Sequence, residues 1–363
     1  MRASKPNIVF IITHDSGTRL GCYGGGSKTP CLDKLAAQGV KLENYFASAP
    51  QCSPSRGSIL TGKAPHVNGL MGLTNRGWDL PASNRTLPAL LNDAGYRTSL
   101  IGLQHVHRDR ASIGYADAGN KVKEMPFFAG IVAKRARTFL EHVAREDLKQ
   151  PFYLELGLNE THRPFPTGRW RRPRKEDVVV PPYLPDTPKV RADIARFDGS
   201  LAEADLHVGM VLEALDKHGF TNNTLVIFTT DHGWPFPRAK GTLYDPGIRT
   251  ACVMRWPGII QAGQTIDALV SNVDMMPTIL DIAGAPVEGT SLAATIQGRS
   301  FKGMLTGDGF TPRDCVHAEL TYHDQGYNPM RCIRTARWKY IHNFNTIGNQ
   351  LFQIPMDFRD GPS

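Results

Sequence analysis

The chain has 363 residues, enough for one large domain of a few hundred residues or for two smaller ones. Hydrophobic residues make up 41% and charged residues 21% of the chain, which excludes the disordered class and favours a globular protein. The net charge of +8 suits an anionic partner, but no Lys/Arg block and no interleaving of basic with aromatic residues favours nucleic acid.

The first half of the chain alternates strand patterns with helix patterns. A continuous apolar run at Asn7–Thr13 predicts a parallel strand that is buried on both faces. Helical spacing over residues 30–38 and 86–94 predicts two helices, which Gly39 and Gly95 would end. Further strands are predicted over residues 98–101 and 152–158.

The alternation continues in the second half. A long amphipathic helix is predicted over residues 192–217, and a buried strand over 225–230. Two more strands are predicted at 251–255 and 268–271, and a helix at 275–283. Strands that alternate with helices indicate the α/β class, here a large, mostly parallel sheet sandwiched by helices.

The pattern of predicted elements changes from about Arg313 onward. Three short strands, at residues 316–322, 330–335 and 338–343, follow one another without helices between them. They predict a small antiparallel subdomain. We therefore expect a catalytic α/β domain over residues 1–311 and a C-terminal α+β subdomain over residues 312–363.

The N-terminus and the cysteines bear on location. The apolar run at residues 8–12 is too short to span a membrane and lacks a signal-peptide cleavage site. The six cysteines are scattered and contain no CxxC pair, which favours free thiols in a reducing compartment. We therefore expect a cytoplasmic protein that has no membrane partner.

The most informative motif is Cys-Ser-Pro-Ser-Arg at residues 52–56, followed by Gly-Ser-Ile-Leu-Thr-Gly. The helix predicted from Ser55 onward would point its N-terminus at Cys52 and favour a bound anion. The motif resembles the signature of the type I sulfatases, a family within the alkaline phosphatase superfamily. The resemblance implies an alkaline phosphatase-like fold. It also implies that a maturation enzyme oxidises Cys52 to formylglycine, whose hydrate is the nucleophile and is oriented by Arg56.

Two more motifs follow predicted strands, at the sheet edge where ligands of α/β proteins bind. They contain His14 and Asp15, and Asp231 and His232. The resemblance implies that these four residues and Cys52 hold one divalent metal ion. The family usually has two Asp at the first motif and Asp-Asn at the second, so both histidines are departures. The family implies Ca²⁺, but the imidazoles favour Mn²⁺ or Zn²⁺. Ordinary turn or cap residues are the alternative at each position.

Three basic residues complete the predicted site. His105 matches the histidine of the family's Gly-Lys-x-His pattern, although Leu103 replaces the lysine. His162 carries over as the acid that protonates the leaving group, a role that suits a pKa near neutrality. Lys240 carries over as a sulfate-binding cation. Each of the three could instead be an ordinary surface residue.

Further pocket candidates with a weaker case are Arg76, His107, Arg108, Asp109 and His323.

Residues 180–188 and 234–237 look like the N-sulfoglucosamine sulfohydrolase branch of the family. We therefore expect a hydrolase that removes sulfate from a sulfate ester or sulfamate, on a sugar or oligosaccharide. A phosphonate monoester or phosphodiester hydrolase of the same superfamily, or a non-catalytic binder of sulfated glycans, are the alternatives. The family's C-terminal subdomain runs further, so we expect this one to be incomplete and its uncovered sheet edge to favour a homo-oligomer.

Overall fold

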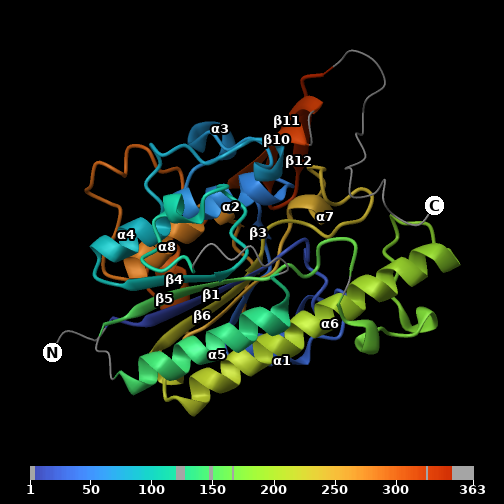
Figure 1. The fold of residues 1–363 in the computed structure, drawn as a ribbon. Coiled ribbons are helices and arrows are strands. Elements are labelled where there is room, and N and C mark those ends of the chain that lie inside the picture. Colours follow the sequence, from blue (N-terminus) through green and yellow to red (C-terminus); the bar gives the residue numbers. More distant parts are fainter. Residues whose placement is uncertain (1–4, 120–126, 147–149, 166, 324–325, 346–363) are drawn as a thin grey trace.

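The computed structural model describes residues 5–119, 127–146, 150–165, 167–323 and 326–345 (Figure 1). Its centre is a seven-stranded sheet in the order β4-β5-β1-β6-β7-β2-β8. The bounds of these strands are β4 Arg97–Gly102, β5 Phe152–Gly157, β1 Asn7–Thr13, β6 Thr224–Thr230, β7 Cys252–Arg255, β2 Val40–Leu42 and β8 Gln264–Ile266. Neighbours among the first four strands run parallel, β7 is antiparallel to β6 and to β2, and β2 and β8 are parallel. The predicted, mostly parallel α/β sheet is therefore confirmed.

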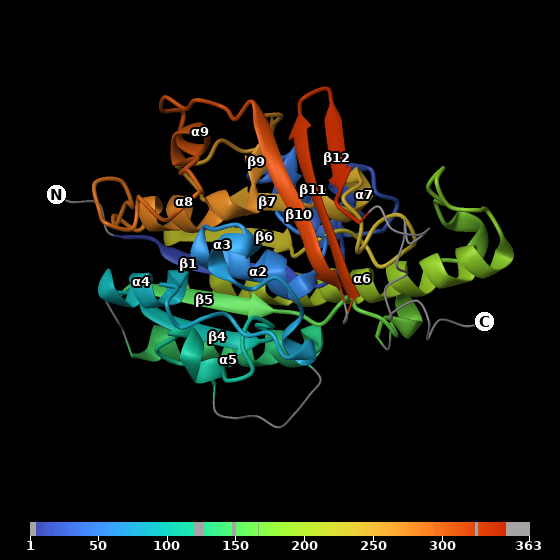
Figure 2. The same cartoon turned by 90° about the horizontal axis from the view of Figure 1, so that it is seen from above.

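Helices cover both faces of the sheet, as Figures 1 and 2 show. One face carries α1 (Pro30–Ala37), α5 (Ala129–Arg145) and α6 (Pro188–Lys217), and the other carries α2 (Cys52–Thr61), α4 (Leu87–Asp93) and α8 (Met275–Ile282). Strand β1 shows why both faces are buried. Val9 and Ile11 pack in the cluster with α5 and α6, whereas Ile8, Phe10 and Ile12 pack in the cluster with α2 and α8. Successive side chains of a strand point to opposite faces, so a continuous apolar run needs cover on both.

A separate antiparallel sheet follows, as predicted. It is formed by β10 (Cys315–His323), β11 (Gly326–Thr335) and β12 (Lys339–Asn343). Its apolar face packs against residues near the main sheet, with Val316, Ala318 and Leu320 in one cluster with Phe46 and Leu243. The boundary at residue 311/312 stays a prediction, and residues 346–363 of the predicted subdomain lie outside the described residues.

The smaller elements connect these layers. They are the strands β3 (Tyr45–Phe46) and β9 (Val270–Ser271), the helices α3 (Pro65–Asn68), α7 (Asp245–Ile248) and α9 (Lys302–Thr306), and the 3-10 turns η1 (Gly21–Tyr23), η2 (Thr74–Arg76), η3 (Arg110–Ile113), η4 (Arg169–Arg171), η5 (Lys175–Asp177), η6 (Thr221–Asn223) and η7 (Asn272–Asp274). Within the described part of the chain, every helix is too short or too polar to cross a lipid bilayer.

Two helix starts were predicted too late. Helix α2 begins at Cys52 rather than at Ser55, because Pro54 falls in the first turn, where the missing N–H has no helical partner to lose. Helix α6 begins at Pro188 rather than at residue 192. Thr187 caps it by accepting a hydrogen bond from the Val190 N–H, and proline is well suited to the first helical position.

Both helices end just before the glycine that was predicted to stop them, α1 at Ala37 and α4 at Asp93. Gly95 has a φ of 84°, the left-handed conformation expected just after a helix. Gly39 has no such φ. A Cβ atom at Gly39 would lie 2.0 Å from the carbonyl oxygen of Met254, so glycine is needed there for the close approach of β7.

Candidate active site

The site begins where β1 and β6 end side by side. Thr13 and Thr230 are paired in the ladder, and each is followed by two of the predicted metal ligands. The two loops are fastened together, because the Asp15 N–H donates to Asp231 Oδ1 over 2.9 Å. Asp15 itself has a φ of 53°, a left-handed conformation that is uncommon outside glycine. Such backbone strain persists where the surroundings enforce it, as they do at many functional sites.

A third loop, after β5, supports the first. The His14 N–H donates to the Glu160 carbonyl over 2.7 Å, and the Thr161 N–H donates to the His14 carbonyl over 2.6 Å. The Thr161 hydroxyl adds hydrogen bonds to the carbonyl oxygens of His14 and Asp15. Thr161 was not among the predicted site residues, although it lies beside the predicted His162.

Cys52 is the first residue of α2 and is 2% exposed. Its Sγ lies 3.3 Å from His232 Nε2, 3.6 Å from His14 Nδ1 and 3.8 Å from Asp15 Oδ1. The partial positive charge at the N-terminus of a helix favours negative charge at this position. The loop from β6 anchors this end of α2, since the Ser55 hydroxyl donates to the Asp231 carbonyl.

The predicted metal ligands form one buried cluster. His14, Asp15, Cys52, Asp231 and His232 each offer a donor atom, and these atoms all lie within 4.8 Å of one another. Two carboxylates, two imidazoles and one sulfur at this spacing fit a single divalent cation. The chemistry of this donor set therefore agrees with one divalent metal ion, without deciding which.

Two cations hold the carboxylates of this cluster. Lys240 Nζ donates to Asp15 Oδ2 over 2.7 Å, and Arg56 Nε donates to Asp231 Oδ2 over 3.0 Å. Burial alone would raise the pKa of Asp15, but the charges of Lys240 and His14 outweigh it and hold that pKa well below its usual range. Burial likewise opposes ionisation of Asp231, and His232, His14 and Arg56 outweigh it. Both groups are therefore carboxylates at neutral pH.

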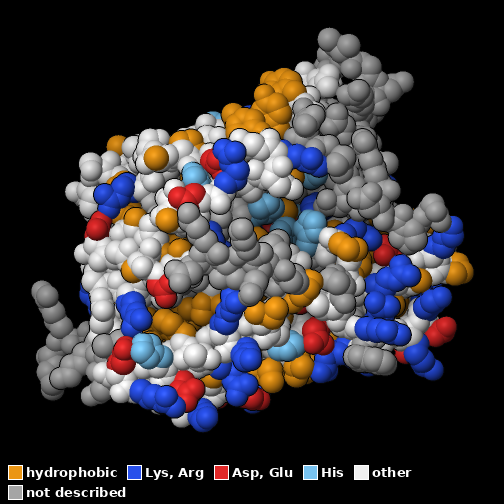
Figure 3. Space-filling view, viewed as in Figure 1, with side chains coloured by type: hydrophobic (Ala, Val, Ile, Leu, Met, Phe, Trp, Pro, Cys, Tyr) orange, Lys and Arg blue, Asp and Glu red, His pale blue; other side chains and the backbone are white. Residues whose placement is uncertain are grey.

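Two more histidines border the cluster. The His162 ring lies 4.6 Å from that of His14 between centroids, and the His105 ring lies 5.6 Å from it. His162 Nδ1 is 2.6 Å from the Arg163 carbonyl oxygen and donates to it, so in the imidazolium form Nε2 carries the second proton. Burial, reinforced by the charges of His14 and Arg56, lowers the pKa of His105 well below its usual range and keeps the ring neutral. Histidine side chains gather near the centre of the face in Figure 3.

The structure thus brings all nine predicted site residues together, from five parts of the chain. Two of the weaker candidates, His323 and Arg108, lie in different places. His323 lies beside Gln51, the residue before Cys52, with its Nδ1 3.4 Å from Gln51 Nε2. Arg108 is exposed and pairs with Asp79, as an ordinary surface arginine does. Leu103 packs against an apolar cluster of the sheet, so it supplies no cation where the family has lysine.

Asn272 is a supporting residue that the sequence analysis missed. Its Nδ2 donates to the carbonyl and the hydroxyl oxygen of Ser55, and its Oδ1 accepts from the Ser48 N–H. It therefore holds the first turn of α2 through Ser55, whose hydroxyl also donates to the Asp231 carbonyl. No local pattern singles out this asparagine, because its partners lie more than 200 residues away in the sequence.

Comparison with known proteins shows the family of this chain. The family model described as Sulfatase matches residues 6–285, and the model described as N-sulphoglucosamine sulphohydrolase, C-terminal, matches residues 230–360. The human protein N-sulphoglucosamine sulphohydrolase is 31% identical to this chain and aligns with 100% of it and 78% of its own length. The N-acetylglucosamine-6-O-sulfatase of Bacteroides thetaiotaomicron is 26% identical over 98% of this chain and 82% of its own.

Solved structures share the fold. A Bacteroides thetaiotaomicron protein of glycosaminoglycan metabolism superimposes with a TM-score of 0.78 at 21% identity, over 93% of this chain and 86% of its own. A structure in complex with its substrate D-glucosamine-2-N,6-O-disulfate gives a TM-score of 0.75 at 22% identity, over 95% and 90% of the two chains. The family match over residues 6–285 decides the assignment: this chain belongs to the sulfatase family.

Proposed function

We propose that this enzyme removes sulfate from a sulfate ester or sulfamate on a sugar, using a formylglycine derived from Cys52 and one divalent metal ion. One observation carries the proposal. Cys52 Sγ lies within 3.8 Å of donor atoms of His14, Asp15 and His232, at the N-terminus of a helix. The thiol sulfur stands where the first oxygen of the oxidised side chain would stand.

Formylglycine at position 52 and the divalent metal ion would supply the nucleophile and a positive charge at the sulfate. An aldehyde hydrate at position 52 offers one hydroxyl to attack sulfur and a second to expel the sulfate afterwards, without attack of water at sulfur. A divalent metal in the five-residue cluster would lower the pKa of a bound hydroxyl and align the sulfate. The other site residues would stabilise charge and transfer a proton to the leaving group.

Arg56 and Lys240 hold the two carboxylates and place positive charge beside residue 52. Their charge favours a bound sulfate and stabilises the negative charge that grows on its oxygens. His162 is the proposed general acid. As imidazolium it gives the Nε2 proton to the oxygen or nitrogen of the sugar as the bond to sulfur breaks. His105, kept neutral by its burial, is proposed to donate a hydrogen bond to the bound sulfate.

The relatives suggest the substrate class. The human relative is named a sulphohydrolase of N-sulphoglucosamine, and a bacterial relative is named a 6-O-sulfatase of N-acetylglucosamine. For this enzyme we therefore propose a glucosamine that carries an N-sulfate or an O-sulfate.

A comparison of rates tests the reaction. Initial rates would be measured side by side on 4-nitrophenyl sulfate, N-sulfoglucosamine, glucosamine 6-sulfate and a phenyl phosphonate monoester, with Cys52→Ala as the inactive control. We expect one of the two sulfated sugars to be turned over fastest. Turnover that survives Cys52→Ala would contradict the proposed nucleophile.

For the metal we propose Ca²⁺, which the family implies. Two imidazole donors favour Mn²⁺ or Zn²⁺ instead, and these ions are the alternatives. The metal content of protein purified without added metal, followed by reconstitution of the chelated enzyme with each ion, would decide. Full recovery with Ca²⁺ alone supports the proposal, whereas recovery with Mn²⁺ or Zn²⁺ alone contradicts it.

A phosphonate monoester hydrolase is the second candidate. It is favoured by the imidazole of His232 among the donors and by Leu103, which leaves one cation fewer around the bound anion. In the comparison of rates it predicts that the phosphonate is the fastest substrate. The cytoplasmic location, the need for a maturation enzyme and a homo-oligomer stay predictions.

A further inference from the structure

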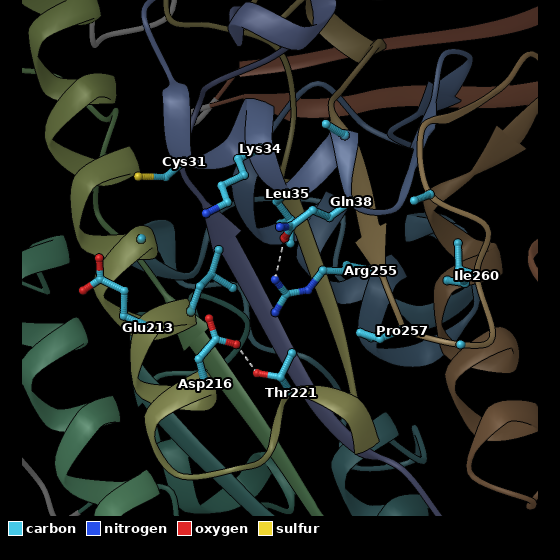
Figure 4. Close-up of a pocket in the computed structure, with 15 residues that line it drawn as sticks. Cys31, Lys34, Leu35, Gln38, Glu213, Asp216, Thr221, Arg255, Pro257 and Ile260 are labelled. Carbon is cyan, nitrogen blue, oxygen red and sulfur yellow. Dashed lines mark hydrogen bonds between the residues drawn. The ribbon is translucent and has the colours of Figure 1, made fainter.

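A cavity lies away from the active site, toward the opposite end of strand β6 in the main sheet. Its volume is about 610 Å³, and it is lined by α1, the C-terminal half of α6 and the loop after β7 (Figure 4). Arg255, at the end of β7, is paired with Val226 near the start of β6. Asp231 of the metal cluster comes five residues after Val226, so roughly 17 Å of strand separates the cavity from the active site. A cavity of this size suits a small molecule.

Arg255 is the unusual residue of this cavity. It is 5% exposed, and its Nη1 donates to Gln38 Oε1 over 2.9 Å. Among the described residues, its Nε and Nη2 find no acceptor. A buried donor without a partner costs free energy, more so when it is charged. A ligand that accepted from both nitrogens would remove this cost.

In two other arginines of this chain, Nε and Nη2 donate together to one carboxylate. Nε and Nη2 of Arg191 donate to the two carboxylate oxygens of Asp186, over 2.5 and 2.7 Å. Nε and Nη2 of Arg174 do the same to Asp177, over 2.9 and 3.0 Å. This edge of the guanidinium matches the spacing of two carboxylate oxygens. Arg255 presents the edge without the carboxylate.

Other groups around the cavity narrow the ligand further. Glu213 and Asp216 line it as well (Figure 4). Neither is within ion-pair distance of Arg255, although the charge of Asp216 acts on its guanidinium, and Asp216 accepts a hydrogen bond from the Thr221 hydroxyl. Their oxygens can accept from hydroxyl groups of a ligand. Cys31 also lines the cavity, but burial and then the nearby Asp205 raise the pKa of its thiol to about 11. The thiol is therefore protonated and inert, which favours binding over covalent chemistry.

We propose that this cavity binds a small hydroxylated carboxylic acid. Its carboxylate accepts from Nε and Nη2 of Arg255, and its hydroxyl groups face Glu213 and Asp216. The site is distinct from the sulfatase centre and does not depend on the function proposed there.

Binding of D-glucuronate tests the proposal, with D-glucose as the probe that lacks the carboxylate. Titration calorimetry at constant ionic strength would compare the wild type, Arg255→Met and the control Arg145→Met, whose arginine is exposed on α5. We expect glucuronate to bind the wild type and the control equally, and Arg255→Met at least about tenfold more weakly, as expected for the loss of charged hydrogen bonds. Glucose should bind none of them measurably. Any glucuronate that binds in the active site does so in all three proteins and cancels in the comparison.

Two outcomes would overturn the proposal. They are no binding of glucuronate to the wild type, and equal binding to the wild type and Arg255→Met. If Arg255→Met does not fold, Arg255→Lys replaces it, since lysine keeps the charge but lacks the two-nitrogen edge, and the same loss is expected. Retention of wild-type affinity in Arg255→Lys would equally overturn the proposal.

Discussion

Replacement of Lys240 by methionine tests the electrostatics of the metal cluster. The Lys240 ammonium lies 2.7 Å from Asp15 Oδ2, and the two side chains are 2% and 0% exposed. Methionine keeps much of the length of the side chain but removes its charge. In metal-free protein the variant leaves the Asp15 carboxylate buried without its strongest partner, and the loss of one partner of a buried ion pair costs about 3–5 kcal/mol.

The loss can be expressed as a melting temperature. The entropy of unfolding is about 2.1 cal/mol/K per residue, or about 0.8 kcal/mol/K for a chain of 363 residues. A loss of about 3–5 kcal/mol then lowers Tm by about 4–7 °C. An added divalent metal supplies positive charge to Asp15 and is expected to restore part of this loss. The metal should therefore stabilise the variant more than it stabilises the wild type.

Differential scanning calorimetry in chelator and in added metal measures both effects. Lys134→Met is the matched control, because Lys134 is exposed on α5, and it should melt within about 1 °C of the wild type. A metal-free Lys240→Met that melted as the wild type does would contradict the stabilising role of the Lys240 charge. An equal rise of Tm on addition of metal to both proteins would also contradict it.

Three further predictions concern proton transfer, the metal and the C-terminal sheet. His162→Gln should lower kcat on a sulfated sugar by about 10²–10⁴-fold. It should lower kcat on 4-nitrophenyl sulfate much less, because nitrophenolate leaves without a proton. Equal losses of kcat on both substrates would contradict the role of His162 as the acid. Chelation should abolish activity and lower Tm, and in Asp231→Asn it should lower Tm less; an unchanged Tm of the chelated wild type would argue against a metal in this cluster. Burial opposes ionisation of Asp245, but Lys339 on β12 and Arg334 on β11 lower its pKa. A lowered pKa contributes stability above the ordinary pKa of aspartate, and this stability is lost as pH falls through the lowered value. Asp245→Asn should therefore weaken the hydrogen-exchange protection of β10–β12 near neutral pH, and the difference from the wild type should vanish in strong acid; a difference that does not depend on pH would contradict this.

Much of the fold could be predicted because it is encoded locally. The strand Asn7–Thr13 was predicted to its exact bounds, since its apolar run begins and ends abruptly. Helix α5 was missed. Half of its buried residues are the alanines Ala129, Ala133 and Ala136, and alanine gives a weak apolar signal. These small side chains let α5 pack closely against α6, which no local pattern reveals. The antiparallel direction of β7 also depends on contacts that are distant in sequence.

The site was predictable for a different reason. His14, Asp15, Asp231 and His232 follow strands directly, and the ends of neighbouring parallel strands meet at one edge of a sheet. What the sequence could not reveal is how the loops are locked. The left-handed backbone of Asp15 and the brace from Asn272 to α2 arise only in the folded chain.

The central claim is that the side chain at position 52 acts as an oxidised former thiol. Mass spectrometry of the tryptic peptide of residues 42–56, from protein made in its native host, tests it most directly. We expect a peptide in which an aldehyde, free or hydrated, has replaced the thiol of Cys52. An active enzyme whose peptide carries only the unmodified thiol would contradict it.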